Sequence, residues 1–275
     1  MPPFPPTTAL VERIAWRDGF ITSGTRTIPE ETPVALTYAR ATHAVMMATP
    51  ADLRDFALGF SLAERIVQHP DDITGLEIVS VPGGIELRMD LIPERMIGLE
   101  RRRRHIIGPG GCGLCGMDSL AEALRPGPLV DSSVRFSATD IQTAQAAMAD
   151  AQSLNALTRA VHGAAFWTHA RGLIALREDV GRHNALDKLL GALRWASTPA
   201  ADGIVLLSSR VSIEMVQKAA VLGAPVVAAV SAPTALAVRA AHDAGLTLIG
   251  VARPDGFEVF THPDRVESGH SPHVA

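Results

Sequence analysis

Two cysteines, Cys112 and Cys115, offer the most reactive chemistry in this chain of 275 residues, and they are its only cysteines. They lie in the segment GPGGCGLCG (108–116), in which five of the nine residues are glycine. Glycine lets a backbone approach another molecule closely, so the sequence predicts two accessible thiols in a loop. Paired thiols of this kind can exchange disulfides, bind a metal ion or carry a sulfur atom.

The CxxC spacing alone leaves two of these functions possible. A thioredoxin-like redox pair needs CxxC at the start of a helix, and a short helix is expected near 117–124. A sulfur carrier needs an accessible thiolate of low pKa that holds an extra sulfur atom as a persulfide. The loop is compatible with both, and the sequence does not rank one above the other.

A resident metal ion is not expected at the cysteines. A structural zinc site has four ligands, whereas only His105 lies near the cysteines in the sequence. Zinc deaminases carry an H-x-E motif and a proline before the CxxC pair. This chain has no H-x-E, and Gly111 precedes Cys112. We therefore exclude deamination and expect no permanently bound metal.

A second set of polar residues follows the expected strands 172–177, 203–207, 225–230 and 246–251. The candidates that come after these strands in turn are Arg182 and His183, Ser209 and Arg210, Ser231, and Arg253. Open α/β sheets bind ligands at the carboxyl ends of their strands, where helix N-termini and arginines bind phosphate. The pattern predicts an anionic, nucleotide-like ligand, although ordinary caps and turns explain any single cluster equally well.

Strands and helices in alternation must position these residues. Beyond the four strands above, the pattern predicts a strand at 161–168 and helices at 137–152, 183–195, 212–222 and 233–244. Short apolar strands between helices indicate an α/β fold, with a mixed but mainly parallel sheet and helices on both faces. Asp179 is expected to hold Arg182 or His183 in place.

Four regions are expected along the chain. They are a small N-terminal α+β domain (1–100), a flexible Gly/Pro-rich linker with the CxxC loop (101–136), an α/β cofactor-binding domain (137–265) and a loose tail (266–275). Within the first region we expect a loose start (1–8), strands at 33–39 and 43–47, and a hairpin over 77–91. A helix should begin with Thr49 as its N-cap and Pro50 in its first turn.

Composition narrows the class of protein. The chain is 47% hydrophobic and 20% charged, which indicates a folded globular protein. Its net charge of −4 argues against a nucleic-acid partner.

The longest apolar stretch (223–238) is interrupted by two prolines and is too short to span a membrane. The start of the sequence lacks the features of a signal peptide, and two cysteines are too few for a secreted disulfide framework. We expect a cytoplasmic location.

Several motifs together resemble one family. The motifs are GFSLAERIV (59–67), CGLCG (112–116), EDVGRHNALDK (178–188), RVSIEMVQKAA (210–220), AAVSAPTALAV (228–238) and LTLIGVARPDGFEVFTHP (246–263). In this order they are similar to the FdhD family, the formate dehydrogenase accessory sulfurtransferases. The resemblance covers about residues 30–263 and is far more specific than a single CxxC pair.

The resemblance implies a sulfur carrier. Such proteins accept sulfur from a cysteine desulfurase and deliver it to the bis-molybdopterin guanine dinucleotide molybdenum cofactor, their bound substrate, on behalf of formate dehydrogenase. The persulfide cysteine corresponds to Cys112, with Cys115 as its partner. The cofactor segment corresponds to Val251, Ala252, Arg253, Pro254, Asp255 and Gly256. The family also implies that GDP can mimic the cofactor, that the C-terminal domain has a cytidine-deaminase-like fold, and that the protein is a homodimer.

One stretch departs from the family, and two other functions stay open. Family members often carry Thr-Gly-Gly-x-His before the middle strand, but this chain has Thr158-Arg-Ala-Val-His162. The missing glycines leave less room for a ligand against that backbone. The main alternative function is a molybdenum-cofactor-binding chaperone without sulfur transfer, and a weaker one is a dithiol oxidoreductase.

Overall fold

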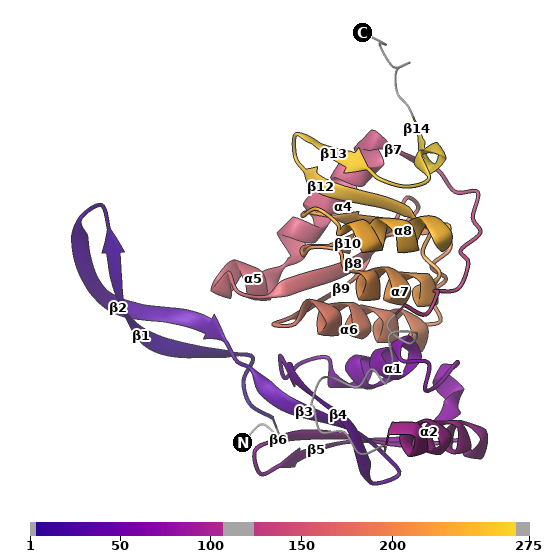
Figure 1. Cartoon of the computed structure of the whole chain (residues 1–275). Helices are drawn as coiled ribbons and strands as arrows, with labels where there is room; N and C mark the ends of the chain where they lie inside the picture. Colours follow the sequence, from indigo (N-terminus) through magenta and orange to yellow (C-terminus); the bar gives the residue numbers. More distant parts are fainter. Residues whose placement is uncertain (1–3, 107–123, 268–275) are drawn as a thin grey trace.

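The computed structural model describes residues 4–106 and 124–267. Two packed parts and a projecting two-stranded ribbon make up the chain (Figure 1). One part is built on a four-stranded sheet and the other on a six-stranded sheet. In the described ranges no helix has the length and apolar character needed to cross a membrane.

The six-stranded sheet has the order β13-β12-β11-β10-β8-β9. Its strands are β8 (His162–Thr168), β9 (Gly172–Asp179), β10 (Gly203–Leu207), β11 (Val226–Ala229), β12 (Thr247–Arg253) and β13 (Gly256–Val259). Only the β10–β11 and β11–β12 pairs are parallel, and the other three are antiparallel. The expectation of a mainly parallel sheet is therefore wrong. Very short connections join β8 to β9 and β12 to β13, and such connections allow only antiparallel hairpins.

Helices cover both faces of this sheet, as predicted. Helix α4 (Ala138–Ala151) packs on one face, and α6 (Arg182–Trp195), α7 (Ile213–Leu222) and α8 (Ala235–Asp243) lie on the other (Figure 1). The predicted capping box at α4 is confirmed, because Asp140 N donates to Ser137 Oγ at 3.1 Å and Ser137 N to Asp140 Oδ2 at 2.9 Å. The short α5 (Ser153–Thr158) follows. The likeness to cytidine deaminases stays a prediction.

The N-terminal part has the sheet order β4-β3-β6-β5, formed by β3 (Thr32–Tyr38), β4 (Ala41–Ala48), β5 (Ile73–Val81) and β6 (Gly84–Leu91). These strands confirm the predicted strand pairs. The predicted start of helix α1 (Leu53–Ala63) is wrong, since Asp52 is its N-cap and Thr49 makes other bonds. The shortest described elements are two 3₁₀ turns, η1 (Pro70–Asp72) and η2 (Pro263–Arg265), and the pair β7 (Phe136–Ser137) with β14 (Val266–Glu267).

The expected linker is shorter than predicted. Helix α2 (Pro93–Ile106) occupies its first six residues, because arginine favours helix and proline suits the first helical position. The later residues of the expected linker are bonded to the second part of the molecule. Gln217 Nε2 donates to the Arg125 carbonyl at 2.8 Å, and Val130 N donates to the Ala244 carbonyl at 2.9 Å. The linker boundary at 101 is therefore corrected to a point after Ile106.

A ribbon of two strands, β1 (Thr8–Arg17) and β2 (Phe20–Pro29), was not predicted. Asp18 and Gly19 form its turn with φ angles of 51° and 81°. Asp-Gly is a strong signal for a two-residue hairpin whose central residues both have positive φ. The signal was present in the sequence, and the loose start expected over residues 1–8 in fact leads into the first strand at Thr8.

The two parts meet along α1 and α6. A Cβ atom at Gly59 would overlap the Asp187 carbonyl, and one at Gly191 would overlap the Asp55 carbonyl. Glycine at both positions therefore allows the helix backbones to approach closely. Buried side chains of both parts belong to one continuous hydrophobic core. The sheet edge described next is thereby held against the N-terminal part.

Candidate functional site

The two predicted catalytic cysteines, Cys112 and Cys115, lie outside the described residues. The structure thus informs the other half of the predicted site, the polar edge of the six-stranded sheet. Strands β10, β11 and β12 run parallel, so their carboxyl ends share this edge. The antiparallel β8 and β9 bring His162 and Asp179 to the same edge as a cross-strand pair.

Short hydrogen bonds join the predicted polar clusters into one edge. Ser208 N donates to the Gly163 carbonyl at 3.0 Å, and Gly163 N to Ser208 Oγ at 2.8 Å. Val251 N donates to the Ser231 carbonyl at 3.3 Å. The structure therefore brings the predicted cofactor-binding residues to one edge of the sheet, at the N-termini of α6, α7 and α8.

Arg182 and His183 open helix α6 at the centre of this edge. Arg182 Nε and His183 Nε2 are buried, and neither has a hydrogen-bond partner among the described residues. The nearest acidic group to the imidazole is Glu214, whose Oε2 is 4.0 Å from His183 Nε2. Buried polar atoms in proteins are nearly always paired with protein, water or ligand. These two atoms indicate a place where a ligand can accept hydrogen bonds.

Burial and nearby positive charge keep the imidazoles neutral, and hydrogen bonds and charges keep the carboxylate ionised. Burial, followed by the charges of Arg182 and Lys218, lowers the pKa of His183 to about 4. Burial and then Arg182 also lower the pKa of His162. Burial opposes ionisation of Glu214, yet the Ser212 hydroxyl, a backbone N–H and the charges of His183 and Arg182 hold its pKa below the usual value. Arg182 is therefore the main cationic group at the centre of the edge near pH 7.

Asp179 fixes the backbone that presents Arg182. Its Oδ1 accepts Gly181 N at 2.8 Å and Asn184 Nδ2 at 3.0 Å. Its Oδ2 is 2.6 Å from Lys188 Nζ and accepts Thr49 N at 3.0 Å. The expectation that Asp179 has a positioning role fits this geometry, with the bonds made to the backbone and to Asn184 rather than to Arg182 or His183 side chains.

Thr49 of the N-terminal part was missed as a support of this edge. Besides its bond to Asp179, its Oγ1 accepts Val180 N at 3.1 Å and its carbonyl accepts Lys188 Nζ at 2.9 Å. The N–H and hydroxyl of Thr49 thus bind the segment that leads into α6, and its carbonyl binds Lys188 within α6. A buried partner this far away in the sequence leaves no local pattern, so only the tertiary structure could reveal it.

Residues 29–267 match the FdhD/NarQ family over most of the chain. The chain belongs to this family. The sulfur carrier protein FdhD of Agrobacterium fabrum is 52% identical over 258 residues, which cover 93% of this chain and 95% of that protein. The protein of the same name from Brucella abortus is 51% identical over 257 residues, covering 93% and 96% of the two chains. The family resemblance found in the motifs is confirmed.

A solved structure shows the same fold. It is titled a putative formate dehydrogenase accessory protein from Desulfotalea psychrophila and superposes with a TM-score of 0.73 at 24% identity. The match covers 95% of this chain and 100% of that one. At this level of identity the likeness concerns the fold, and the FdhD/NarQ assignment stands on the sequence matches.

In this FdhD/NarQ chain the predicted cofactor segment contains a strained backbone. Val251 has a φ of 51°, and the β12–β13 register shifts between Gly250 and Arg253. A β-branched residue with positive φ is a genuine outlier, and such strain clusters at functional sites. Within this segment Ala252 is buried, and its side chain lies in the core. The next three residues, Arg253, Pro254 and Asp255, are exposed at the rim, and Gly256 begins β13.

The serines and the second arginine of the edge differ in exposure. Ser209 is buried, and its hydroxyl donates to the Arg210 carbonyl at 3.1 Å. Arg210 is exposed, and Ser231 is half-buried. Arg210 and Arg253 therefore lie at the solvent rim, whereas Arg182 lies deeper. In this arrangement Ser209 stabilises the loop before α7.

Only two of the 25 basic residues are lysines, and both form buried ion pairs. Lys188 Nζ lies 2.6 Å from Asp179 Oδ2, and Lys218 Nζ lies 2.6 Å from Asp187 Oδ1. Burial raises the pKa of Asp187 to about 6, although Lys218 opposes this shift. Both lysines therefore serve the packing of α6 against its neighbours and are not available to a ligand at the edge.

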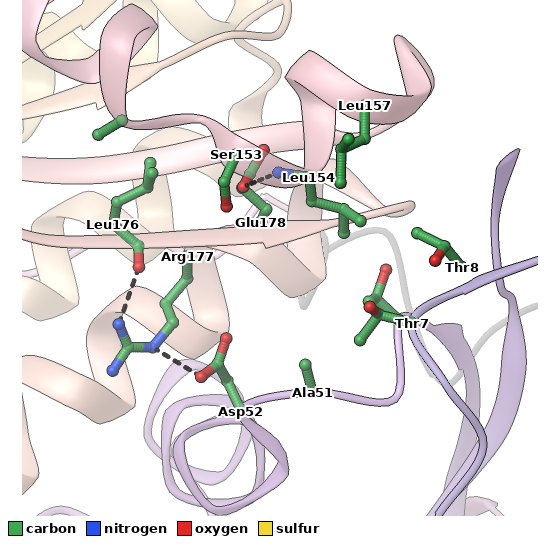
Figure 2. Close-up of a pocket in the computed structure, with 12 residues that line it drawn as sticks. Thr7, Thr8, Ala51, Asp52, Ser153, Leu154, Leu157, Leu176, Arg177 and Glu178 are labelled. Atoms are coloured by element: carbon green, nitrogen blue, oxygen red, sulfur yellow. Dashed lines mark hydrogen bonds and ion pairs between the residues drawn. The ribbon is translucent and has the colours of Figure 1, made fainter. Parts of the chain in front are cut away.

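A cavity of about 540 Å³ lies beside β9 (Figure 2), and Thr49, which supports the edge, is also among its lining residues. Thr7, Thr8, Asp52, Leu154, Leu157, Arg177 and Glu178 are among its lining residues. Its charges are already paired: Arg177 binds Asp52 and Asp55, and Glu178 accepts two backbone N–H groups of α5. It therefore lacks the unpartnered donors of the sheet edge. Within the described ranges no group of three or more acidic, histidine or cysteine residues is placed to hold a metal.

Proposed function

We propose that this chain is a cytoplasmic sulfur carrier for the bis-molybdopterin guanine dinucleotide cofactor of formate dehydrogenase. It accepts sulfur from a cysteine desulfurase on its CxxC pair and transfers it to the cofactor bound at the sheet edge. The observation that best supports this function is the pair of buried nitrogen atoms without a hydrogen-bond partner at the edge, Arg182 Nε and His183 Nε2. The CxxC pair and the name sulfur carrier protein FdhD, borne by relatives about 50% identical, support the transfer of sulfur.

The edge suits an anionic dinucleotide. Three helix N-termini carry partial positive charge, which favours phosphate, and those of α6 and α7 have no side-chain cap. Arg182 binds from within, and Arg210 and Arg253 bind from the rim. Arginine forms two parallel hydrogen bonds to a phosphate, so these side chains can hold the diphosphate arms. Guanine nucleotides such as GDP are the natural probes of this site.

The described chain after the cysteines runs along α7 and α8. Followed backward, residues 130 to 124 run along α7 and α8 from their C-terminal ends toward their N-termini. Val130 bonds to Ala244, just after α8, and Arg125 bonds to Gln217, midway along α7. Leu124 lines one small cavity together with residues from both helices, among them Ile213 and Leu236. This course supports delivery of sulfur from the CxxC pair to the edge.

Both steps balance with the two thiols, the donor persulfide and a thiol reductant that restores the thiol pair. In the loading step the Cys112 thiolate attacks the terminal sulfur of the donor persulfide. The donor S–S bond breaks, the donor thiolate leaves, and no net oxidation occurs. In the delivery step the Cys115 thiolate attacks Cys112 Sγ, and the persulfide bond breaks to release HS⁻. A Cys112–Cys115 disulfide remains, so the thiol pair supplies the two electrons, and a thiol reductant restores it.

Mass spectrometry of the intact protein after incubation with a cysteine desulfurase and cysteine tests this function. We expect a gain of one sulfur atom on the peptide that contains Cys112, reversed by a thiol reductant and abolished by Cys112→Ala. Without added reductant, Cys115→Ala should load sulfur but fail to release it as sulfide. Guanine nucleotide binding without any gain of sulfur, while the desulfurase loads another acceptor, would instead support a cofactor chaperone.

A further inference from the structure

One acidic side chain lies among the basic groups of the sheet edge. Glu214 is in the first turn of α7, which packs beside α6 on one face of the six-stranded sheet (Figure 1). Its Oε2 is 4.0 Å from Nε2 of His183, in the first turn of α6, and the charge of Arg182 also acts on it. A carboxylate repels phosphate, so Glu214 is suited to a different part of the ligand.

Glu214 and His183 offer a ligand one acceptor group and one donor group. Their side chains are 39% and 32% exposed. The pKa of Glu214 is below its usual value, so near pH 7 the ionised carboxylate only accepts hydrogen bonds. The imidazole is neutral at this pH because its pKa is about 4, and with its proton on Nε2 it donates one hydrogen bond. At 4.0 Å the two groups are too far apart to bond to each other, so both are available to one ligand.

Among the described residues no lysine or arginine forms an ion pair with Glu214, whose closest contact of this kind is the one with His183. Lys218 lies one turn further along α7, but its Nζ is bound to Asp187 Oδ1 at 2.6 Å. A carboxylate has about four acceptor sites. Glu214 therefore keeps the capacity to accept hydrogen bonds from two N–H groups of a ligand.

On the basis of the proposed function, we propose that Glu214 reads the base of the bound nucleotide and selects guanine. Guanine carries two adjacent N–H donors, N1–H and the N2 amino group, and the acceptor O6 lies next to N1 on the same side of the ring. The two oxygens of the Glu214 carboxylate accept these donors, and His183 Nε2 donates to O6. Arg182 and the arginines at the rim remain for the phosphates.

Other purine bases lack this pattern. Adenine has an acceptor at N1 and an amino donor at C6, so the carboxylate and the imidazole donor would each face a group of their own kind. Xanthine has an oxygen in place of the amino group at C2, and this oxygen would face Glu214. Hypoxanthine has N1–H but no polar group at C2. A site built to bond a polar group rejects an analogue without it, because its own polar groups are left unpaired.

Titration calorimetry of the full chain with four nucleoside diphosphates tests base reading without any substitution. The wild-type chain should bind GDP at least about tenfold more tightly than ADP or xanthosine diphosphate. Inosine diphosphate, which lacks only the amino group of guanine, should have an affinity between those of GDP and ADP. Equal dissociation constants for GDP and ADP would overturn the selective role of Glu214 and leave the nucleotide-binding edge intact.

Glu214→Gln should change which base is preferred. Glutamine presents one acceptor and one donor, which match the N1–H and the C2 oxygen of xanthine. The variant should therefore bind GDP about ten- to a hundredfold more weakly and bind xanthosine diphosphate more tightly than GDP. ADP binding should not weaken, because a negative charge beside an anionic ligand has been removed. Glu258→Gln is the matched control: Glu258 is exposed on the outermost strand β13, and its loss should leave GDP affinity within about twofold.

The pattern of losses separates base reading from general damage to the edge. Parallel weakening of GDP and ADP in Glu214→Gln would show damage to the whole edge and would overturn the proposal. Unchanged GDP affinity in that variant, or equal weakening by Glu258→Gln, would overturn it as well. A wild-type chain that binds none of the four nucleotides would overturn the proposed function together with the role of Glu214.

Discussion

His183 couples the candidate site to the stability of the whole chain. Its pKa is about 4 in the folded protein, against an ordinary value of 6.5. Between these values the unfolded chain binds the proton and the folded chain does not, so acid favours unfolding. The free energy of unfolding should therefore fall as the pH drops from about 6.5 to about 4, with His162 adding to the same trend.

Urea unfolding at a series of pH values measures this trend. His183→Asn removes the titrating group while keeping a small polar side chain, so its free energy of unfolding should depend less steeply on pH over the same interval. An unchanged slope in the variant would show that other groups control acid stability and that His183 is not kept neutral in the folded protein.

Thr49 is expected to tune ligand affinity through Val180 and Asp179 without touching the ligand. Thr49→Val removes only the hydroxyl that accepts Val180 N, and a lost buried hydrogen bond costs about 1 kcal/mol. If the loosened turn displaces Arg182, calorimetry should show weaker GDP binding by about fivefold. Thr49→Ser keeps the hydroxyl and should restore the wild-type affinity.

A buried threonine outside the edge controls for stability alone. The Thr247 hydroxyl donates to the His262 carbonyl at 2.8 Å and is equally buried. Thr247→Val should lower the melting temperature about as much as Thr49→Val but leave GDP affinity unchanged. Equal GDP affinities in both variants would contradict a positioning role for Thr49, whereas a wild-type protein that binds no guanine nucleotide would contradict the proposed substrate edge itself.

At the scale of elements, the close crossing of α1 and α6 predicts a sharp difference between two glycines. Gly59→Ala would drive a methyl group into the Asp187 carbonyl and should destabilise the chain by about 1–3 kcal/mol or more. Gly98 of α2 has open space around its Cβ position, so Gly98→Ala should stabilise by about 0.5–1 kcal/mol through helix propensity. Chemical denaturation measures both, and similar losses in the two variants would argue against the crossing.

The elements that periodicity predicted are those buried on one or both faces. Strand β10 and helix α4 are examples, because an apolar run and a capping box each leave a local signal. The predominance of antiparallel pairs in the sheet was not predictable from apolar runs alone, since parallel and antiparallel central strands look alike. Helix α2 was missed because its arginines resemble a solvated linker. The ribbon was missed although Asp18-Gly19 marks its turn, because it has no buried face to impose a pattern.

The candidate site also contains residues that could be predicted from the sequence and residues that only the structure reveals. Arg182 and Ser231 could be assigned to one edge from the order of strands and helices, because that edge follows from where each strand ends. Thr49 could not, because it comes from another part of the chain. The motif that includes Val251 was found by resemblance, but its backbone strain became visible only in the structure. Residues of the edge itself can be predicted from the sequence, whereas the residues that position them depend on tertiary packing.

For the whole molecule, the junction predicts cooperative unfolding of both parts together. One continuous core contains side chains from the four-stranded sheet, α1, α6 and the six-stranded sheet. Asn184 Nδ2 donates to the Met47 carbonyl at 2.8 Å, and Lys188 Nζ to the Thr49 carbonyl at 2.9 Å, so polar bonds cross the junction as well. Neither part can lose its structure without exposing the core of the other.

Differential scanning calorimetry should therefore show a single transition whose calorimetric and van't Hoff enthalpies agree. Gly59→Ala, which disturbs only the junction, should shift this transition to lower temperature without splitting it. Two resolved transitions in the wild-type chain would mean that the parts are independent domains joined by a linker. In that case the N-terminal part could not hold the sheet edge in place, and Thr49 would lose its predicted influence on GDP binding.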